Sequence, residues 1–284
     1  YLYYPNLMIM KHLIAIVLFA FSLSLESQDL KVMTYNIRLD HAGDNENNWH
    51  HRKDELVKQI QFYEPDVFGV QEALPQQMDY LDSTLAEYVY IGVGRDDGKR
   101  AGEFSAVFYK KDLFKIIDGS TFWLSPTPGE VSKGWDAALP RVCTYALLEK
   151  SDGQRFWFFN THFDHVGKQA RVESMKLILS QIQEKNDAGY PVVLSGDLNV
   201  TPDQEPIIEM KKVLKDSREA ANLAFGPDAT FNGFNFTQSP QRRIDYIAVS
   251  EGINVKKYAV LTDSFDQKYI SDHFPVFCVL SFTD

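Results

Sequence analysis

The sequence predicts an α+β protein in which one β-sheet packs on another and helices cover the outer faces. Short apolar runs typical of strands alternate along the chain with longer amphipathic runs. Two of the strand-like runs, 142–148 and 275–280, carry apolar residues on both faces, which is typical of strands that are buried on both sides. The run 168–185 instead has one apolar stripe, at helical spacings of three and four: Val172, Met175, Leu179 and Ile182. A strand that is apolar on both faces needs another layer packed on each face. A helix with one apolar stripe can form such a layer on one of them.

The elements follow one another without a linker, a repeat or a low-complexity stretch. Strands are predicted at 30–37, 66–70, 88–93, 104–110, 114–124, 142–149, 155–161, 191–194, 244–250, 255–261 and 274–282. Helices are predicted at 52–63, 76–85, 168–185 and about 204–214. The continuous pattern predicts a single domain over residues 28–284.

Composition excludes several classes of protein. The chain has 284 residues, of which 44% are hydrophobic and 13% aromatic, so it can bury a large core and is not disordered. Its net charge of −10 gives it no overall attraction to nucleic acid or to anionic membranes, although a basic rim or a bound cation can override this locally. The two cysteines, Cys143 and Cys278, are too few for a disulfide scaffold and too far apart for a thiolate zinc site.

The first part of the chain predicts export. Lys11 precedes an apolar run of nine residues, 13–21, and small polar residues follow it, which is the pattern of a secretory signal peptide. We therefore expect residues 1–27 to be a signal peptide with an upstream extension, and the mature protein to be periplasmic or secreted. A transmembrane anchor is the alternative, but nine apolar residues are too short to span the membrane as a helix.

Polar residues follow four of the predicted strands at the point where each strand ends. They are Asn36, Gln71 with Glu72, residues 160–164 (NTHFD), and residues 195–199 (SGDLN). Ligands of α/β sheets gather at the carboxyl ends of strands, so these four ends are expected to converge on one rim. Two further groups lie near the C-terminus, Asp245 on a strand and Asp272 with His273 just before the last one.

Each of these residues also has a structural explanation when it is taken alone. Asn36 could cap the turn after its strand, and Gly196 with Asp197 resembles a common tight turn. Glu72 could interact favourably with the dipole of the following helix. His162 could be an ordinary surface histidine, and Asp272 and His273 an ordinary loop. Asp245 could pair with Arg242 or Arg243.

Taken together, the motifs resemble those of the endonuclease/exonuclease/phosphatase family. They occur in the order 34–38 (TYNIR), 71–72 (QE), 160–164 (NTHFD), 196–199 (GDLN), 244–246 (IDY) and 271–273 (SDH), and the stretches 102–109 and 140–144 also fit. The resemblance covers residues 30–282 and is closest to the secreted bacterial branch, near the deadenylase-like members. It implies a four-layer α/β/β/α sandwich of two mixed sheets and a metal-dependent hydrolysis of phosphate esters.

The resemblance also implies a metal site. Glu72 would be the main ligand, Asn36 a ligand or a phosphate contact, and Asp272 a contributor to a second metal position. Oxygen ligands without cysteine favour a hard cation, so Mg²⁺ is expected first and Mn²⁺ second.

The catalytic residues implied by the resemblance are His162, Asp197, Asn199, Asp245 and His273. Asp245 would orient His273, since a carboxylate on one ring nitrogen makes an imidazole more basic. Asp197 would position or deprotonate the attacking water, while Asn199 and His162 would bind phosphoryl oxygens or the leaving group.

The sequence specifies the substrate less closely than the fold or the catalytic residues. Arg141 and Asn232 are the candidates for substrate binding, with a buried ion pair as the alternative role of Arg141; Arg38, Arg95 and Arg100 could present further cations. The substrate could be a nucleic acid, a nucleotide, a sugar phosphate or an inositol phosphate, and the protein is expected to be a monomer. A sphingomyelinase-like lipid hydrolase, with aromatic residues of 122–135 at a membrane, and an inactive binding module are the alternative functions.

Overall fold

The computed structural model describes residues 29–283. The signal peptide predicted at 1–27 lies outside the described residues, so that assignment stays a prediction. Among residues 29–283, no helix combines the length and the apolar character needed to cross a membrane.

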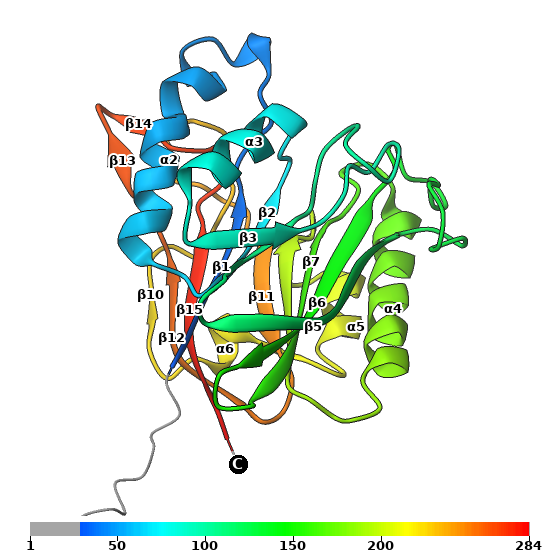
Figure 1. Ribbon diagram of the computed structural model, residues 1–284. Coiled ribbons are helices and arrows are strands. Elements are labelled where there is room, and N and C mark those ends of the chain that lie inside the picture. The colour runs from blue at the N-terminus through cyan, green and yellow to red at the C-terminus, as the bar shows by residue number, and fades with distance from the viewer. Residues whose placement is uncertain (1–28, 284) are drawn as a thin grey trace, which may run out of the picture.

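Two large sheets form the centre of the molecule (Figure 1). The first has the order β10-β12-β15-β1-β2-β4-β3, with β10 at Ala224–Phe225, β12 at Ile253–Val260, β15 at Val276–Phe282, β1 at Leu30–Asn36, β2 at Val67–Gln71, β4 at Val107–Lys110 and β3 at Tyr88–Ile91. The second has the order β5-β6-β7-β8-β11-β9, with β5 at Phe114–Trp123, β6 at Val142–Lys150, β7 at Arg155–His162, β8 at Val192–Asp197, β11 at Asp245–Val249 and β9 at Lys215–Asp216. A small hairpin pairs β13 (Ser264–Phe265) with β14 (Lys268–Tyr269).

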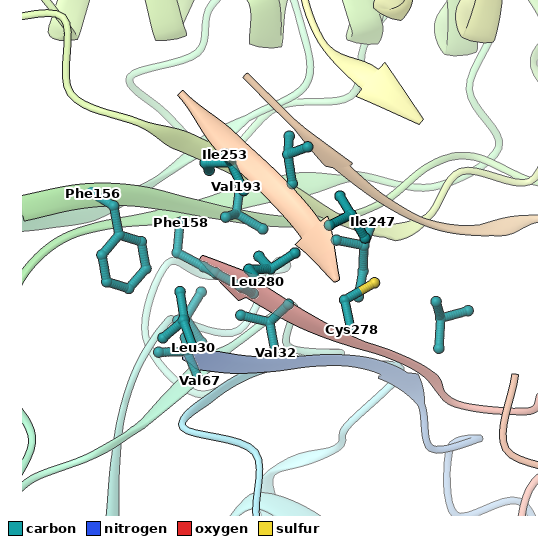
Figure 2. Packing of buried hydrophobic residues seen from close by; sticks show 14 of the residues in the cluster. Leu30, Val32, Val67, Phe156, Phe158, Val193, Ile247, Ile253, Cys278 and Leu280 are labelled. Atoms are coloured by element: carbon teal, nitrogen blue, oxygen red, sulfur yellow. The ribbon is translucent and has the colours of Figure 1, made fainter. Parts of the chain in front are cut away.

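The two sheets pack face to face through an apolar core. Figure 2 shows Val32 and Leu280 of the first sheet close to Phe158, Val193 and Ile247 of the second, and all five are almost fully buried. This layer accounts for the two-faced strands that the sequence contains, because a strand in such a sandwich has a sheet on one side and a helix on the other.

Helices cover the outer faces, which confirms the predicted four-layer sandwich. Helix α2 (Trp49–Tyr63) and helix α3 (Pro75–Thr84) pack on the first sheet, while α4 (Lys168–Lys185) and α5 (Glu205–Met210) pack on the second (Figure 1). The short elements η1 (Ala42–Asn47) and α6 (Ser217–Ala220) complete the helices.

Three details differ from the sequence prediction. In α4 the buried stripe is centred on Met175, Ile178 and Ile182, while Val172 and Leu179 are only partly buried, because the helix faces the sheet along a line shifted by about one residue. The final strand, β15, is buried on one face only, with Phe277 half-buried beside the ring of Tyr63 at the end of α2. The helix expected at 204–214 ends at Met210, and tight turns replace its last turn.

The two cysteines do not pair. Cys143 lies on β6 and Cys278 on β15, which belong to different sheets, and both are fully buried as free thiols.

The strand register brings the functional residues together. β1 and β2 are parallel, with Asn36 opposite Gln71, so Glu72 follows directly beside Asn36. β7 and β8 are also parallel, with His162 opposite Asp197. Both pairs therefore end at the same edge of the sandwich.

Candidate active site

A cavity of about 350 Å³ opens at this edge. Seven of the predicted site residues line it, Arg141 among them: Glu72, Arg141, His162, Asp197, Asn199, Asp272 and His273. Arg38, Glu103, Phe231 and Arg242 line it as well. The residues come from both sheets, so the site is a property of the whole sandwich.

Asn36 connects the two sides of the cavity. Its Nδ2 donates to Glu72 Oε1 at 3.0 Å and to Asp197 Oδ2 at 3.0 Å, and its Oδ1 accepts from the backbone N–H of Arg38 at 3.0 Å. Glu72 has a φ of 64°, a left-handed conformation immediately after β2 that turns its side chain back toward Asn36. Its second oxygen accepts from the backbone N–H of Leu39 at 3.1 Å. Asn36 and Glu72 thus lie side by side, as the prediction required.

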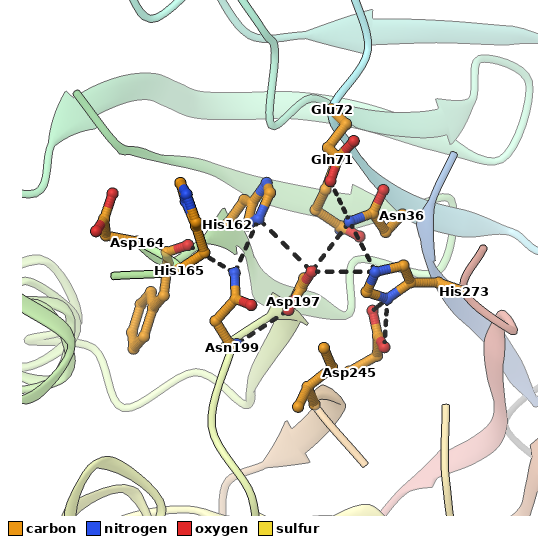
Figure 3. Close-up of polar contacts among 12 residues, drawn as sticks. Asn36, Gln71, Glu72, His162, Asp164, His165, Asp197, Asn199, Asp245 and His273 are labelled. Atoms are coloured by element: carbon orange, nitrogen blue, oxygen red, sulfur yellow. Dashed lines mark hydrogen bonds and ion pairs between the residues drawn. The ribbon is translucent and has the colours of Figure 1, made fainter. Parts of the chain in front are cut away.

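Asp197 lies at the centre of the polar network in Figure 3. Oδ1 accepts from the backbone N–H of Asn199 at 2.9 Å, while Oδ2 lies 3.5 Å from His162 Nε2 and 3.7 Å from His273 Nε2. Burial and the nearby charge of Asp245 raise the pKa of Asp197 to about 7. A carboxylate with this pKa can exchange a proton near neutral pH, as a general base must.

Gly196 is the reason that Asp197 can lie so close to β7. Its φ is +149°, and a Cβ at this position would lie 2.1 Å from the carbonyl oxygen of Thr161. Only glycine allows this approach of the two backbones. The glycine of the GDLN motif is therefore explained by packing, while the aspartate that follows it faces the cavity.

His273 and Asp245 form a buried pair. His273 Nδ1 donates to Asp245 Oδ2 at 2.9 Å, and both side chains are at most 5% exposed. Burial disfavours the charged imidazole, but the carboxylates of Asp245 and Asp197 outweigh it and raise the pKa of His273 well above its usual value. His273 is therefore an imidazolium whose Nε2 points to Asp197. The alternative pairing of Asp245 with an arginine does not occur, because Arg243 pairs with Asp216 at 2.6 Å.

His162 lies on the other side of Asp197. Its Nε2 accepts from Asn199 Nδ2 at 3.1 Å, which places the proton on Nδ1, 3.8 Å from Glu103 Oε2. Burial and the charges of Arg141 and Arg95 lower the pKa of His162 well below its usual value, so the ring is neutral. Glu103 was not among the predicted site residues, since it precedes a strand instead of following one; only its place in the stretch 102–109 marked it.

Arg141 combines the two roles that the sequence left open. The side chain is 5% exposed, its Nη2 lies 3.1 Å from His165 Nδ1, and its Nε lies 3.5 Å from Asp164 Oδ2. Its Nη1 lies 3.8 Å from Glu103 Oε2 and has no hydrogen-bond partner among the described residues, while the side chain as a whole lines the cavity. Arg141 is thus in a buried ion pair and still has a donor for a ligand.

Asn232 does not line the cavity. Its Nδ2 donates to the carbonyl of Ser271 at 3.0 Å and its Oδ1 accepts from the backbone N–H of Phe234 at 2.8 Å. The preceding residue, Phe231, packs against the His273 ring at 5.0 Å between centroids and lines the cavity instead. The substrate-binding role of Asn232 stays a prediction. In the structure its side chain holds the loop that carries Phe231.

Of the other arginines considered from the sequence, only Arg38 reaches the cavity. Arg95 is buried in an ion pair with Glu103 at 2.6 Å, and Arg100 pairs with Asp79 at 2.7 Å on the surface.

The residues present fit a bound cation. Glu72 and Asp272 both face the cavity, and burial, together with the charge of Glu72, raises the pKa of Asp272. A divalent cation would relieve this crowding of carboxylates, and all the donors are oxygen atoms of the kind that hard cations prefer. Asp197, Asp245 and His273 also offer ligand atoms within 4.8 Å of one another, so this cluster too has the composition of a metal site.

Comparison with known proteins agrees with this geometry. Residues 33–273 match the model of the Endonuclease/Exonuclease/phosphatase family. A family member from Bacteroides thetaiotaomicron is 39% identical, with a TM-score of 0.87 over 91% of this chain and 99% of that one. A mannosyl-6-phosphatase from the same organism is 40% identical, with a TM-score of 0.86 over 89% of this chain and all of that one.

A probable RNA exonuclease of Saccharomyces cerevisiae is 26% identical over 205 residues, which is 66% of this chain and 41% of that protein. The family model covers most of the chain, and the solved relatives cover almost all of their own length. This chain belongs to the endonuclease/exonuclease/phosphatase family and is a phosphoesterase of that family.

Proposed function

We propose that the protein is an exported, Mg²⁺-dependent phosphatase that hydrolyses the phosphomonoester of a sugar. The observation that carries this proposal is the cavity that Glu72, Asp197 and His273 line, with the buried Asn36 hydrogen-bonded to both Glu72 and Asp197. The similarity to a mannosyl-6-phosphatase, which extends over the full length of that protein, supports a sugar phosphate. The cavity volume of about 350 Å³ suits a small molecule, and the net charge of −10 does not favour nucleic acid.

Glu72, Asn36 and Asp272 are the residues that would hold the metal ion, with Mn²⁺ as the alternative to Mg²⁺. The bound cation would neutralise charge on the phosphoryl oxygens. The residues of the chain supply the remaining needs of hydrolysis, which are a positioned water, hydrogen bonds to the phosphoryl oxygens and assistance to the leaving group.

Asp197 takes the proton of the attacking water, since its pKa of about 7 suits a general base. The imidazolium of His273, oriented by Asp245, donates from Nε2 to a phosphoryl oxygen. Nη1 of Arg141, which has no hydrogen-bond partner among the described residues, donates to another oxygen of the same group. Asn199 can donate to this group only by giving up one of the two hydrogen bonds of its Nδ2, to His162 Nε2 at 3.1 Å or to the carbonyl of Phe163 at 3.0 Å.

As the water oxygen bonds to phosphorus and the P–O bond to the sugar breaks, the leaving oxygen takes up the proton that Asp197 has accepted. His162, held between Asn199 and Glu103 with its Nε2 3.5 Å from Asp197 Oδ2, would hold the leaving group beside this carboxylate.

The two other functions considered from the sequence have less support. Of the aromatic residues proposed to touch a membrane, Phe122 and Trp123 are packed inside, each 6% exposed, and Trp123 Nε1 donates to the carbonyl of Arg95 at 2.8 Å. Trp135 is only partly buried. An inactive module would lack a side chain of the site, but Glu72, Asp197 and His273 are all in place.

Export rests on the sequence of residues 1–27 alone. Amino-terminal sequencing of the protein from its native host is expected to place the mature start between Leu23 and Asp29. A mature protein that keeps Met8 or Met10 would contradict export by cleavage.

The metal requirement is the first test. Wild-type protein is expected to hydrolyse a phosphomonoester with Mg²⁺ and to lose this activity in chelator, since Glu72 holds the ion. Glu72→Gln keeps the shape but removes the charge, so the Mg²⁺ concentration for half-maximal activity is expected to rise about tenfold or more. Glu184→Gln, at an exposed position of α4, is the matched control. Full activity of the wild type in chelator would exclude the metal mechanism.

The substrate class is tested with a panel. Mannose 6-phosphate and other sugar phosphates are expected to give a higher kcat/KM than inositol phosphates, nucleotides, an oligonucleotide or sphingomyelin. The physical reason is the small cavity, which has few cations for a long polyanion. A higher kcat/KM for the oligonucleotide or for sphingomyelin would overturn the proposal of a sugar phosphatase and favour a phosphodiesterase of that substrate.

A further inference from the structure

Arg38 lies beside the two carboxylates to which the proposed function assigns metal binding. Its Nη1 is 3.9 Å from Glu72 Oε2, and its Nε is 3.9 Å from Asp272 Oδ2. Both distances are too long for hydrogen bonds, so the guanidinium faces the carboxylates without being bonded to either. A guanidinium free to move would be expected to close on such a pair of carboxylates.

Asp44, in η1, keeps it from doing so. Its carboxylate binds the guanidinium through two hydrogen bonds, Nε to Oδ2 at 2.9 Å and Nη2 to Oδ1 at 2.9 Å. This is the two-pronged geometry that makes arginine–carboxylate pairs strong. The Asp44 side chain is 11% exposed, so the pair is only weakly screened by solvent.

The backbone of Arg38 is fixed independently of its side chain. The N–H donates to Asn36 Oδ1, and the carbonyl accepts from Arg52 Nη2 at 2.7 Å and from Gln77 Nε2 at 2.9 Å. Its φ of 56° is left-handed and directs the side chain into the cavity. Replacement of the side chain therefore leaves the bonds that shape this turn in place.

We propose that Arg38 is a built-in second cation of the site, which Asp44 holds beside the metal-binding carboxylates so that it binds the phosphoryl group together with the metal ion. This inference rests on the proposed function, in which Glu72 and Asp272 bind a divalent cation. Arg38 is therefore expected to affect the binding of the metal ion and the binding of phosphate in opposite directions. Arg38 repels the metal ion and attracts the phosphate, so its removal strengthens the binding of the first and weakens that of the second.

The test is a calorimetric titration of metal-free protein with Mn²⁺, followed by titration of the Mn²⁺-loaded protein with inorganic phosphate. Arg38→Met is expected to lower the dissociation constant for Mn²⁺ by about tenfold and to raise that for phosphate by about tenfold. Damage to the fold would weaken both. Arg100→Met, which removes a surface arginine outside the cavity, is the matched control and is expected to change neither.

Asp44→Asn tests the second half of the proposal. It releases Arg38 toward Glu72 and Asp272, so Mn²⁺ is expected to bind several-fold more weakly. If Asp44 acts through Arg38, the same substitution has a much smaller effect in protein that already carries Arg38→Met. Equal effects of Asp44→Asn in both backgrounds would show that Asp44 does not act by holding Arg38, and would overturn this half.

Different results would refute the proposed metal site and the proposed role of Arg38. Wild-type Mn²⁺ binding that Glu72→Gln does not weaken would refute the metal assignment, and the role of Arg38 with it. Binding that depends on Glu72 but is weakened or unchanged by Arg38→Met would overturn the role of Arg38 alone. Phosphate binding that is unchanged by Arg38→Met would do the same.

Discussion

Asp245→Asn is expected to lower kcat by about 10²–10⁴-fold, because a positioned proton donor and acid–base assistance in the transition state are worth that much. The amide can still accept from His273 Nδ1, but it removes the negative charge that raises the pKa of His273. The pKa of His273 falls, so a smaller fraction of the ring carries the proton that Nε2 donates to the phosphoryl group. Asp245 does not line the cavity, so the substitution acts through the two residues whose pKa its charge raises, His273 and Asp197.

The measurement is kcat on the folded protein together with Mn²⁺ binding, for Asp245→Asn, His273→Ala and the double variant. We expect Mn²⁺ still to bind, and the double variant to lose little more than His273→Ala, since members of one catalytic unit are not additive. If the pair is only structural, Asp245→Asn will lower the melting temperature and leave kcat near wild type. Additive losses would show two independent residues.

Asn160→Leu is expected to lower the free energy of unfolding by about 3–5 kcal/mol, because it breaks a fully buried hydrogen-bond network. Asn160 Nδ2 donates to the carbonyls of Val70 and Ala106, each at 2.9 Å, and its Oδ1 accepts from Gln71 Nε2 at 2.7 Å and Ser195 Oγ at 3.1 Å. All four hydrogen-bonding positions of the amide are used. Leucine has a similar size but leaves all four partners without this bond.

The network also ties the two sheets together directly beneath the cavity. Asn160 belongs to β7 of the second sheet, while Val70 and Gln71 belong to β2 of the first. The fit is close, because a Cβ on Gly69 would lie 2.2 Å from Asn160 Oδ1. An apolar interface alone sets no register between two sheets, whereas a satisfied polar network does.

Urea unfolding of Asn160→Leu measures this contribution. Asn222→Leu is the control, since Asn222 is exposed and its side chain makes only a 3.5 Å contact with Asn254; we expect a change below about 0.5 kcal/mol. A loss of less than about 1 kcal/mol for Asn160→Leu would show that the network adds little to the net stability.

The sequence was sufficient for the fold and for most of the site because both depend on local patterns. The two-faced strands and one-sided helices determine the layers. The helical periodicity of residues 168–185 already predicts that this segment, helix α4, covers one outer face. Asn36, His162 and Asp197 are the last residues of their strands, and Glu72 directly follows β2. Parallel neighbours bring such positions to one edge, so their meeting could be predicted without coordinates.

Other parts of the site depend on tertiary structure, because loops between distant elements bring them in. Glu103 reaches His162 from the segment before β4, and Phe231 replaces Asn232 at the cavity because the loop turns the asparagine inward. The sequence shows that Arg38 follows Asn36, but not that Asp44 binds its guanidinium. The sequence by itself therefore determined the family, the layers and the residues at the strand ends. Only the tertiary structure decided which charges face one another, because a charge acts through distances of a few ångströms that strand periodicity does not specify.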